Sequence, residues 1–398
     1  MLAALGSHRT AVALIVIEIA LAFAVISNAV VLISQRVRWM QMRSGVDLNQ
    51  LVFVSTSGAG RDPGPIDATV LGKLRLIPGV RAAAIVNTVP FAARTGTAGF
   101  FLDPGQRHFG RVADFYFGTP GYLRVLGVRL LAGRGFAKSA YRPFALFPQS
   151  GGALIDQSLA NLLWPGQDPL GRMIWIGKQA HYTIIGITGA VIRPDPQYAS
   201  PADAYDSVFL PAGPSAGFGG GFVMRTAPAE RDRILRAAYE VIHGVDRRLI
   251  IDRGNSGALT DLRAAYFRRE RIMIGLLAGI IGALMLVTGV GILGLSAFWV
   301  QQRSRHIGIR RAVGARSVDV LRYFQMENFL IVTAGIAAGC GAAVAANLWL
   351  MAHYAVPRLP VLYLPIGAVM LWLLGQVAVL WPALRAAALP PTAAIGQG

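Results

Sequence analysis

Four long apolar stretches constrain this 398-residue chain more than any other feature of its sequence. They cover residues 11–33, 272–300, 329–351 and 361–383. A helix needs about 20 predominantly apolar residues to cross the hydrocarbon core of a bilayer. Each stretch reaches that length, so the sequence predicts an integral membrane protein with four spanning helices.

The first apolar stretch, 11–33, could be an uncleaved anchor or a cleaved signal peptide. Its apolar region is about twice as long as that of a signal peptide. Ser27, Asn28 and Ala29 form a poor cleavage site deep inside it. An uncleaved anchor is therefore the preferred interpretation.

The arginines between the stretches predict the orientation of the chain. Segment 301–324 contains a single acidic residue, Asp319, beside a group of basic ones. The group consists of Arg303, Arg305, Arg310, Arg311, Arg316 and Arg322. The short loop after the third stretch contains only Arg358. Because cytoplasmic loops carry the excess of Lys and Arg, we expect 301–324 and both termini in the cytoplasm of an inner-membrane protein, and 35–271 outside.

The net charge of +18 would, taken alone, suggest binding to nucleic acid. The acidic residues are simply few, however, with 20 against 38 basic ones, and the basic residues are scattered along the chain. A nucleic-acid partner is therefore not predicted.

Segment 35–271 has the composition of a globular α+β domain. Strands are expected at 51–56, 80–89, 182–187, 221–226 and 248–252, with helices at 65–77 and 228–244. Two strand–helix–strand units separated by an insertion indicate a split ferredoxin-like core. We place the core at about 47–96 and 212–255, with a mainly β insertion at about 97–211.

A predicted helical stalk, 256–271, follows this domain, with Asn255 or Ser256 as its cap. It runs into the second apolar stretch without a breaker. Its stalk residues are Leu259, Leu262 and Tyr266. We therefore expect one continuous helix that couples the domain mechanically to the membrane.

Segment 300–315 reads Val-Gln-Gln-Arg-Ser-Arg-His-Ile-Gly-Ile-Arg-Arg-Ala-Val-Gly-Ala. It resembles the signature loop of the FtsX-like permease family of ABC transporters, although His306 stands where that family commonly has Glu. Segments 117–136, 164–171 and 182–189 look like core-domain motifs of MacB-type permeases, and 382–387 is similar to the family's closing segment.

The resemblance implies a fold similar to that of type VII ABC permeases. In this fold, residues 1–34 contain the first span, residues 35–271 form an extracytoplasmic MacB-like domain, and residues 272–398 form an FtsX-like permease domain. It further implies mechanotransmission by a dimer, either homodimeric or heterodimeric with a second permease. A separate ABC ATPase would bind ATP and Mg, and this chain would bind no cofactor directly. The further expected partners are a periplasmic adaptor and membrane lipid.

The same resemblance assigns segment 301–324 as the loop that docks on the ATPase. The expected coupling residues are Arg303, His306, Ile307, Gly308, Ile309, Arg310, Arg311, Ala312, Gly314 and Ala315. The isoleucines and alanines offer apolar surface, and the arginines offer charge. A topological role for the arginines alone is the competing interpretation.

Glu18 is a carboxylate within the first span. Such residues are costly in a bilayer and are usually functional or internally paired. Two interpretations stay open, namely a hydrogen bond that packs helices and a role in the conformational cycle.

Signals for catalysis are weak. No P-loop run, G-x-x-x-x-G-K-[ST], occurs. Segment 289–294 fits G-x-G-x-x-G but lies within an apolar stretch, where glycines favour helix packing, as does the pair Gly275 and Gly279. Segment 213–217 fits G-x-S-x-G but is followed by a glycine-rich tract. The dispersed histidines and the lone Cys340 predict no metal site and no disulfide, so a non-enzymatic chain is expected.

The leading hypothesis is a permease subunit that drives export of a hydrophobic compound, peptide or toxin. One alternative is a permease that extracts lipoproteins from the membrane. Another is a signalling module whose outer domain activates a cell-wall hydrolase.

Overall fold

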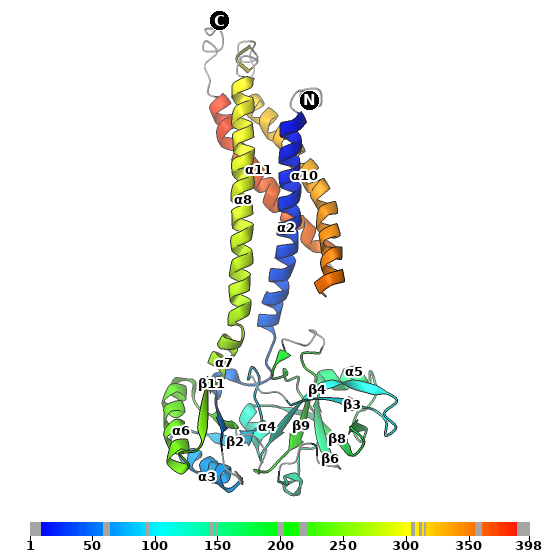
Figure 1. Cartoon of the computed structure of the whole chain (residues 1–398), viewed down its shortest axis with the longest axis vertical. Helices are drawn as coiled ribbons and strands as arrows, with labels where there is room; N and C mark the ends of the chain where they lie inside the picture. Colours follow the sequence, from blue (N-terminus) through cyan, green and yellow to red (C-terminus); the bar gives the residue numbers. More distant parts are fainter. Residues whose placement is uncertain are drawn as a thin grey trace. The chain divides into compact units, whose positions relative to one another are not determined.

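The computed structural model of the chain forms two compact units, which are residues 1–40 with 269–398, called here the membrane unit, and residues 41–268, called the outer domain (Figure 1). The structure describes residues 9–58, 64–92, 96–143, 147, 150–196, 203–214, 221–303, 307–309, 313, 316–354 and 360–387. Each unit is described by itself.

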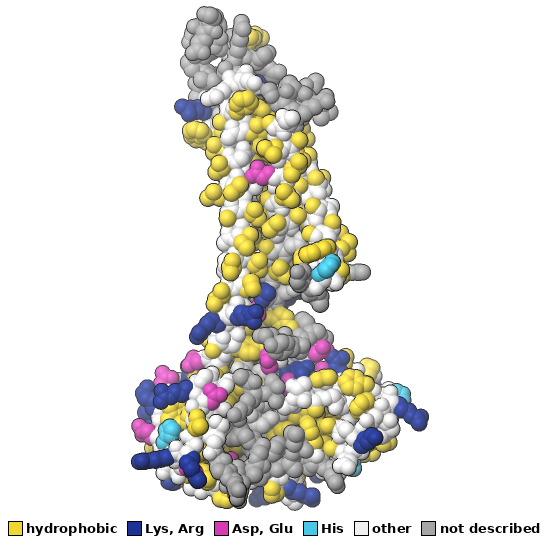
Figure 2. Space-filling model, in the orientation of Figure 1, with side chains coloured by type: hydrophobic (Ala, Val, Ile, Leu, Met, Phe, Trp, Pro, Cys, Tyr) yellow, Lys and Arg dark blue, Asp and Glu magenta, His cyan; other side chains and the backbone are white. Residues whose placement is uncertain are grey.

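Four helices that are long and apolar enough to cross a membrane confirm the predicted spans. They are α2 (Arg9–Gln41), α8 (Arg268–Gln302), α10 (Ser317–Tyr354) and α11 (Leu364–Ala387), the last preceded by the 3-10 turn η6 (Val361–Tyr363). Hydrophobic side chains cover most of the visible surface of these helices (Figure 2). Helix α10 begins within the predicted loop 301–324, so the connection between the second and third spans is shorter than expected.

Close contacts between α2 and α10 depend on two glycines four residues apart. A Cβ added at Gly335 would lie 2.6 Å from Cγ2 of Ile19, and one at Gly339 would lie 2.8 Å from Cβ of Phe23. The small-xxx-small pattern thus brings these helices together. Around Gly275 and Gly279, in contrast, an added Cβ would meet nothing within 4 Å in the described part of this chain.

The outer domain contains the predicted ferredoxin-like core. Its elements are β1 (Leu51–Ser57), α3 (Gly64–Leu74), β2 (Ala82–Val86), β10 (Gly221–Arg225), η5 (Pro228–Glu230), α6 (Arg231–Val245) and β11 (Ile250–Ala258). The strand order β11-β1-β10-β2 is antiparallel throughout. Alternate residues of β1 face opposite sides of the sheet, so Val52 and Val54 join one core with α3 and α6, whereas Leu51 and Phe53 join another.

The mainly β insertion is also confirmed, and its strands close on themselves. The elements are β3 (Thr97–Phe101), β4 (Phe109–Gly118), α4 (Tyr122–Leu126), β5 (Leu130–Gly133), η3 (Lys138–Ala140), β6 (Ser150–Asp156), α5 (Gln157–Leu163), β7 (Met173–Ile176), β8 (Ala180–Thr188) and β9 (Ser207–Pro211). The order β4-β3-β7-β8-β6-β9 returns to its start because β9 pairs with β4 in parallel. This arrangement places β4 and β9 side by side in the middle of the domain.

The predicted continuous stalk helix is wrong in two places. Strand β11 extends to Ala258, so Asn255 and Ser256 are strand residues, and α7 (Leu259–Tyr266) starts after them. The Ser256 hydroxyl accepts from the amide of Ser55 at 2.9 Å in a bulged part of the sheet, which removes it as a helix cap. The helix then breaks at Phe267, with φ −86° and ψ 10°, before α8 begins.

Candidate functional site

Arg303 lies just beyond α8 and its guanidinium is bound inside the membrane unit. Its Nη1 donates to both carboxylate oxygens of Glu327 on α10, at 3.0 and 2.8 Å, and to the hydroxyl of Tyr323 at 3.3 Å. The guanidinium carbon lies 5.7 Å from the centre of the Trp299 ring. Glu327 is only 4% exposed, so removing the arginine would leave a buried charge unpaired. This predicted coupling residue therefore holds α8 against α10.

Among the other predicted coupling residues, Ile307, Gly308 and Ile309 are described and helical. Ile307 is buried and packs in the membrane-unit core. Ile309 is 53% exposed and Val313 is 85% exposed, and the amide of Val313 donates to the carbonyl of Ile309 at 3.1 Å. We call Ile309 and Val313 the loop pair. His306, Arg310, Arg311, Ala312, Gly314 and Ala315 lie outside the described residues.

Glu18 is half-buried on α2, opposite Gly291 of α8. A Cβ at Gly291 would lie 2.9 Å from Oε2 of Glu18, so glycine makes room for the carboxylate. Its Oε1 is buried and meets no hydrogen-bond partner within the part of the chain that the structure describes. This arrangement leaves both interpretations of Glu18 as predictions.

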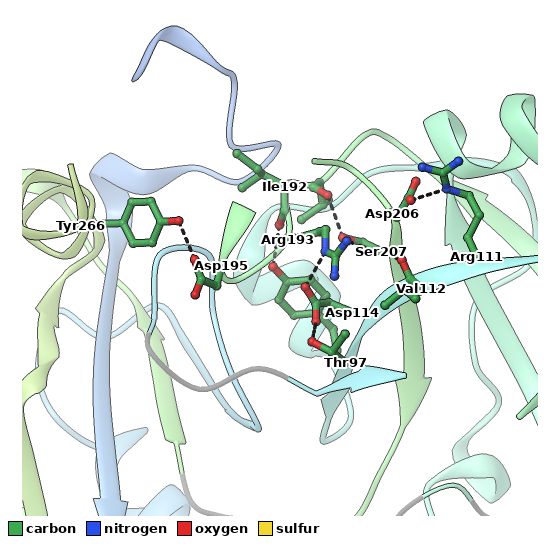
Figure 3. A network of polar contacts seen from close by, with 12 residues as sticks. Thr97, Arg111, Val112, Asp114, Ile192, Arg193, Asp195, Asp206, Ser207 and Tyr266 are labelled. Atoms are coloured by element: carbon green, nitrogen blue, oxygen red, sulfur yellow. Dashed lines mark hydrogen bonds and ion pairs between the residues drawn. The ribbon is translucent and has the colours of Figure 1, made fainter. Parts of the chain in front are cut away.

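In the outer domain, α7 is fixed to the loop 190–196 at its C-terminal end. The hydroxyl of Tyr266 donates to Oδ1 of Asp195 at 2.6 Å (Figure 3). At the start of the same helix Leu259 and Leu262, both predicted stalk residues, are buried in the domain core. The three predicted stalk residues thus anchor the helix to the domain, although the helix ends sooner than expected.

The ring of Phe91 packs against this end of α7. Its ring centre lies 5.6 Å from that of Tyr266 and 5.7 Å from that of Phe267. Phe91 is 4% exposed and has a φ of +68°, a conformation that is unusual for a bulky residue. Backbone of this kind persists only where its surroundings hold it in place, here by the rings and by a 2.9 Å bond from its amide to the carbonyl of Pro194.

The loop 190–196 is bound in turn to β4 and β9 by a buried polar network (Figure 3). Nε of Arg193 donates to Oδ2 of Asp114 at 2.7 Å, and the hydroxyl of Tyr116 donates to the carbonyl of Ile192 at 2.6 Å. The hydroxyl of Ser207 donates to the carbonyl of Val191 at 2.9 Å. Movement of α7 would therefore be transmitted to the closed sheet.

Two carboxyl groups at the edge of this network are affected by burial. Burial raises the pKa of Asp206, against the opposing effect of Arg111, whose Nε donates to it at 2.7 Å. Burial also raises the pKa of Asp156 well above its usual range, although the Asp156 side chain caps α5 through the Leu159 amide. Sequence reasoning missed this network because its members are scattered between residues 111 and 207 and share no motif.

A pocket of about 440 Å³ lies elsewhere in the outer domain, between α3, β2 and α4. Three exposed arginines contribute to its wall, and Arg75 already donates to the carbonyl of Ala83. The lining residues are Arg75, Val80, Arg81, Ala82, Ala83, Pro120, Gly121, Arg124 and Val125. Among the described residues, no group of three or more His, Cys, Asp or Glu could hold a metal ion.

A family model described as the MacB-like periplasmic core domain matches residues 10–242, which is more than half of the chain. The chain belongs to this family. Residues 278–391 match a second family, the FtsX-like permease C-terminal domain. The MacB-like domain and the FtsX-like domain therefore follow one another in the order that the sequence motifs suggested, and the chain is a multi-pass membrane protein of this MacB/FtsX type.

Among its relatives is the macrolide export ATP-binding/permease protein MacB of Azoarcus sp. (strain BH72), which is 31% identical over 214 residues, covering 50% of this chain and 30% of the relative. Another is the uncharacterized ABC transporter permease YknZ of Bacillus subtilis (strain 168), which is 26% identical and covers 69% of this chain and 68% of the relative. The chain spans about a third of the length of the MacB relatives.

A solved structure of the periplasmic region of MacB from Actinobacillus actinomycetemcomitans is also similar. It is 12% identical, has a TM-score of 0.35, and covers 52% of this chain and 89% of that chain.

Proposed function

We propose that this chain is the permease subunit of a MacB/FtsX-type ABC transporter, and that it converts ATP hydrolysis by a separate ATPase into movement of its outer domain. One observation carries the proposal. Helix α8 ends beside the Arg303–Glu327 pair, and at its other end the chain leads directly into α7, which Phe91 and Asp195 hold in the domain. At 1.5 Å per residue this helix is about 50 Å long, enough to cross a bilayer.

The family match and the loop pair support docking on an ABC ATPase that binds ATP and Mg. Exposed Ile309 and Val313 offer apolar surface to that partner, while the half-buried Arg303 transfers its movement to α10. The loop and both termini would then lie in the cytoplasm and the outer domain in the periplasm. A permease dimer, either homodimeric or heterodimeric, and a periplasmic adaptor complete the proposed assembly.

The proposed cargo is a hydrophobic compound, peptide or toxin that is exported by movement of the outer domain. The printed name of one relative, MacB of Azoarcus, states macrolide export. The spans of this chain present few polar side chains that could line a path between them, which favours mechanotransmission over passage through the bundle. Co-purification of the full-length chain would identify its ATPase and outer partners.

Substitution of Ile309 tests the coupling. Ile309→Glu places a charge on the exposed loop pair, so we expect the protein to insert and fold but ATP hydrolysis by the partner to lose its link to export. The conservative Ile309→Val keeps an apolar surface and should retain export. Export and ATPase rates are measured in proteoliposomes containing the chain and its ATPase. Full export by Ile309→Glu would contradict the assignment of this loop.

A further inference from the structure

A small cavity lies inside the membrane unit beside the Arg303–Glu327 pair. It measures about 10 Å³ and is lined by residues of α2, α8 and α10. Its polar lining consists of Ser296, Trp299, Glu327 and Asn328. A cavity needs roughly 10–15 Å³ of such space to hold one water molecule. The cavity therefore reaches the smallest size that a single water molecule needs.

Two polar atoms of the lining residues meet no partner among the described residues. They are Nε1 of Trp299 and Nδ2 of Asn328. Both are hydrogen-bond donors, and their side chains are only 5% and 6% exposed. A buried donor without an acceptor destabilises the folded state, because it loses its hydrogen bond to water. Both residues line the cavity, and an acceptor inside it would satisfy such a donor.

The same cavity also offers acceptors. The carboxylate of Glu327 accepts from Nη1 of Arg303 at 3.0 and 2.8 Å. A carboxylate has about four lone-pair positions, so others stay open, and the hydroxyl of Ser296 is a further partner. The carboxylate disfavours an anion in this space and the two N–H donors disfavour a cation. A neutral molecule that both accepts and donates fits the lining.

We propose that this cavity binds one water molecule, which accepts hydrogen bonds from Trp299 Nε1 and Asn328 Nδ2 and donates to Glu327. The water joins α8 to α10 next to the turn that carries Arg303. Water-mediated contacts are nearly as favourable as direct ones, and they re-form readily with new partners. In the proposed function α8 transfers its movement to α10, and the water would add a second link between these helices beside the Arg303–Glu327 pair; this consequence rests on that function, whereas the water site itself does not.

X-ray radiolysis of the full chain in lipid nanodiscs tests the site, because hydroxyl radicals formed from bound water oxidise the adjacent side chains. The reference is Trp372 of the same unit, which is more exposed than Trp299 and whose Nε1 donates to Thr333 Oγ1 at 3.1 Å. With water bound beside it, Trp299 should be oxidised at least about threefold faster than Trp372 in mass spectrometry. Equal or slower oxidation of Trp299 would overturn the proposal, whatever the outcome of the Ile309 experiment.

Two substitutions of Asn328 should have opposite effects on the oxidation rate of Trp299. Asn328→Leu fills the cavity and removes a donor, so oxidation of Trp299 should fall to the rate of Trp372. Asn328→Ala enlarges the cavity and should retain the fast oxidation, which keeps the test decisive if the leucine variant does not fold. As a control, Asn347→Leu alters a 4% exposed asparagine elsewhere on α10 and should leave the rate unchanged. Similar rates for the leucine and alanine variants would rule the water out.

Discussion

Asp67 is a buried residue whose ionisation contributes to the pH dependence of the outer domain. It lies in the first turn of α3 and is 2% exposed. Burial raises its pKa from 3.8 to about 6. The folded state therefore holds the proton more tightly than the unfolded state, and the stability of the domain falls as the pH rises from about 4 to about 6.

Asp67→Asn should remove this dependence. A shift of about two pKa units corresponds to about 3 kcal/mol, so the variant should be more stable than the parent above pH 6 by up to that amount and similar to it near pH 4. Thermal unfolding of the full chain in detergent across this pH range measures the effect. Asp232→Asn, at an exposed position on α6, serves as the control. Identical pH profiles for the parent and Asp67→Asn would refute the assignment.

The sequence predicts the positions of some individual residues but not of others, and the difference has a physical reason. Leu259 and Leu262 were predicted as stalk residues because helical spacing marks one face of a helix, but that spacing does not show that they pack in the domain core. Arg303 was recognised as important, but its inward bond to Glu327 depends on how two helices pack, which no local pattern encodes. Phe91 carried no signal at all, because its unusual backbone is imposed by rings that lie far along the chain.

At the level of elements, the break between α7 and α8 depends on Phe91. Phe91→Ala and Phe91→Gly both remove the ring contacts, and loss of a buried phenylalanine costs about 3–5 kcal/mol. Glycine adopts a φ of +68° without strain, whereas alanine does not. We therefore expect the glycine variant to be more stable than the alanine variant by about 1 kcal/mol.

Denaturant unfolding of the outer domain within the full chain measures which of the two variants is more stable. The comparison is informative because glycine is normally the less stable of the two residues. An alanine variant as stable as the glycine variant, or more stable, would show that the strain at Phe91 is relieved in solution.

The spans and the elements of the ferredoxin-like core could be predicted from periodicity, because strands and helices that bury one face repeat their apolar residues at fixed spacing. Among the described strands of the insertion, β8 alone was predicted. The end of β11 and the break at Phe267 could not be predicted. Asn255 and Ser256 favour helix caps locally, but pairing with β1 extends the strand through them. No glycine or proline marks Phe267, whose ring packs on Phe91 where the helix stops.

For the molecule as a whole, sequence sufficed for the division into spans and outer domain, since apolar length and charge follow from the bilayer itself. The ferredoxin-like core was also predictable from the two strand–helix–strand units. Closure of the insertion into a ring was not, because the parallel pairing of β4 with β9 joins strands almost a hundred residues apart. In the proposed function this ring matters, since it binds the loop that holds α7.

A flexible insertion between α7 and α8 tests whether force is transmitted through α7. Inserting Gly-Gly-Ser between Tyr266 and Phe267 leaves each unit able to fold but lets α8 move without displacing the domain, because glycine-rich linkers behave as flexible coils. The control places the same insertion in the exposed turn at Gly177, between β7 and β8. In proteoliposomes with the ATPase, the first insertion should reduce export to background while ATP hydrolysis continues, and the control should retain both. Export that survives the first insertion would mean that the outer domain is driven by another route, such as the connection from α2 to β1.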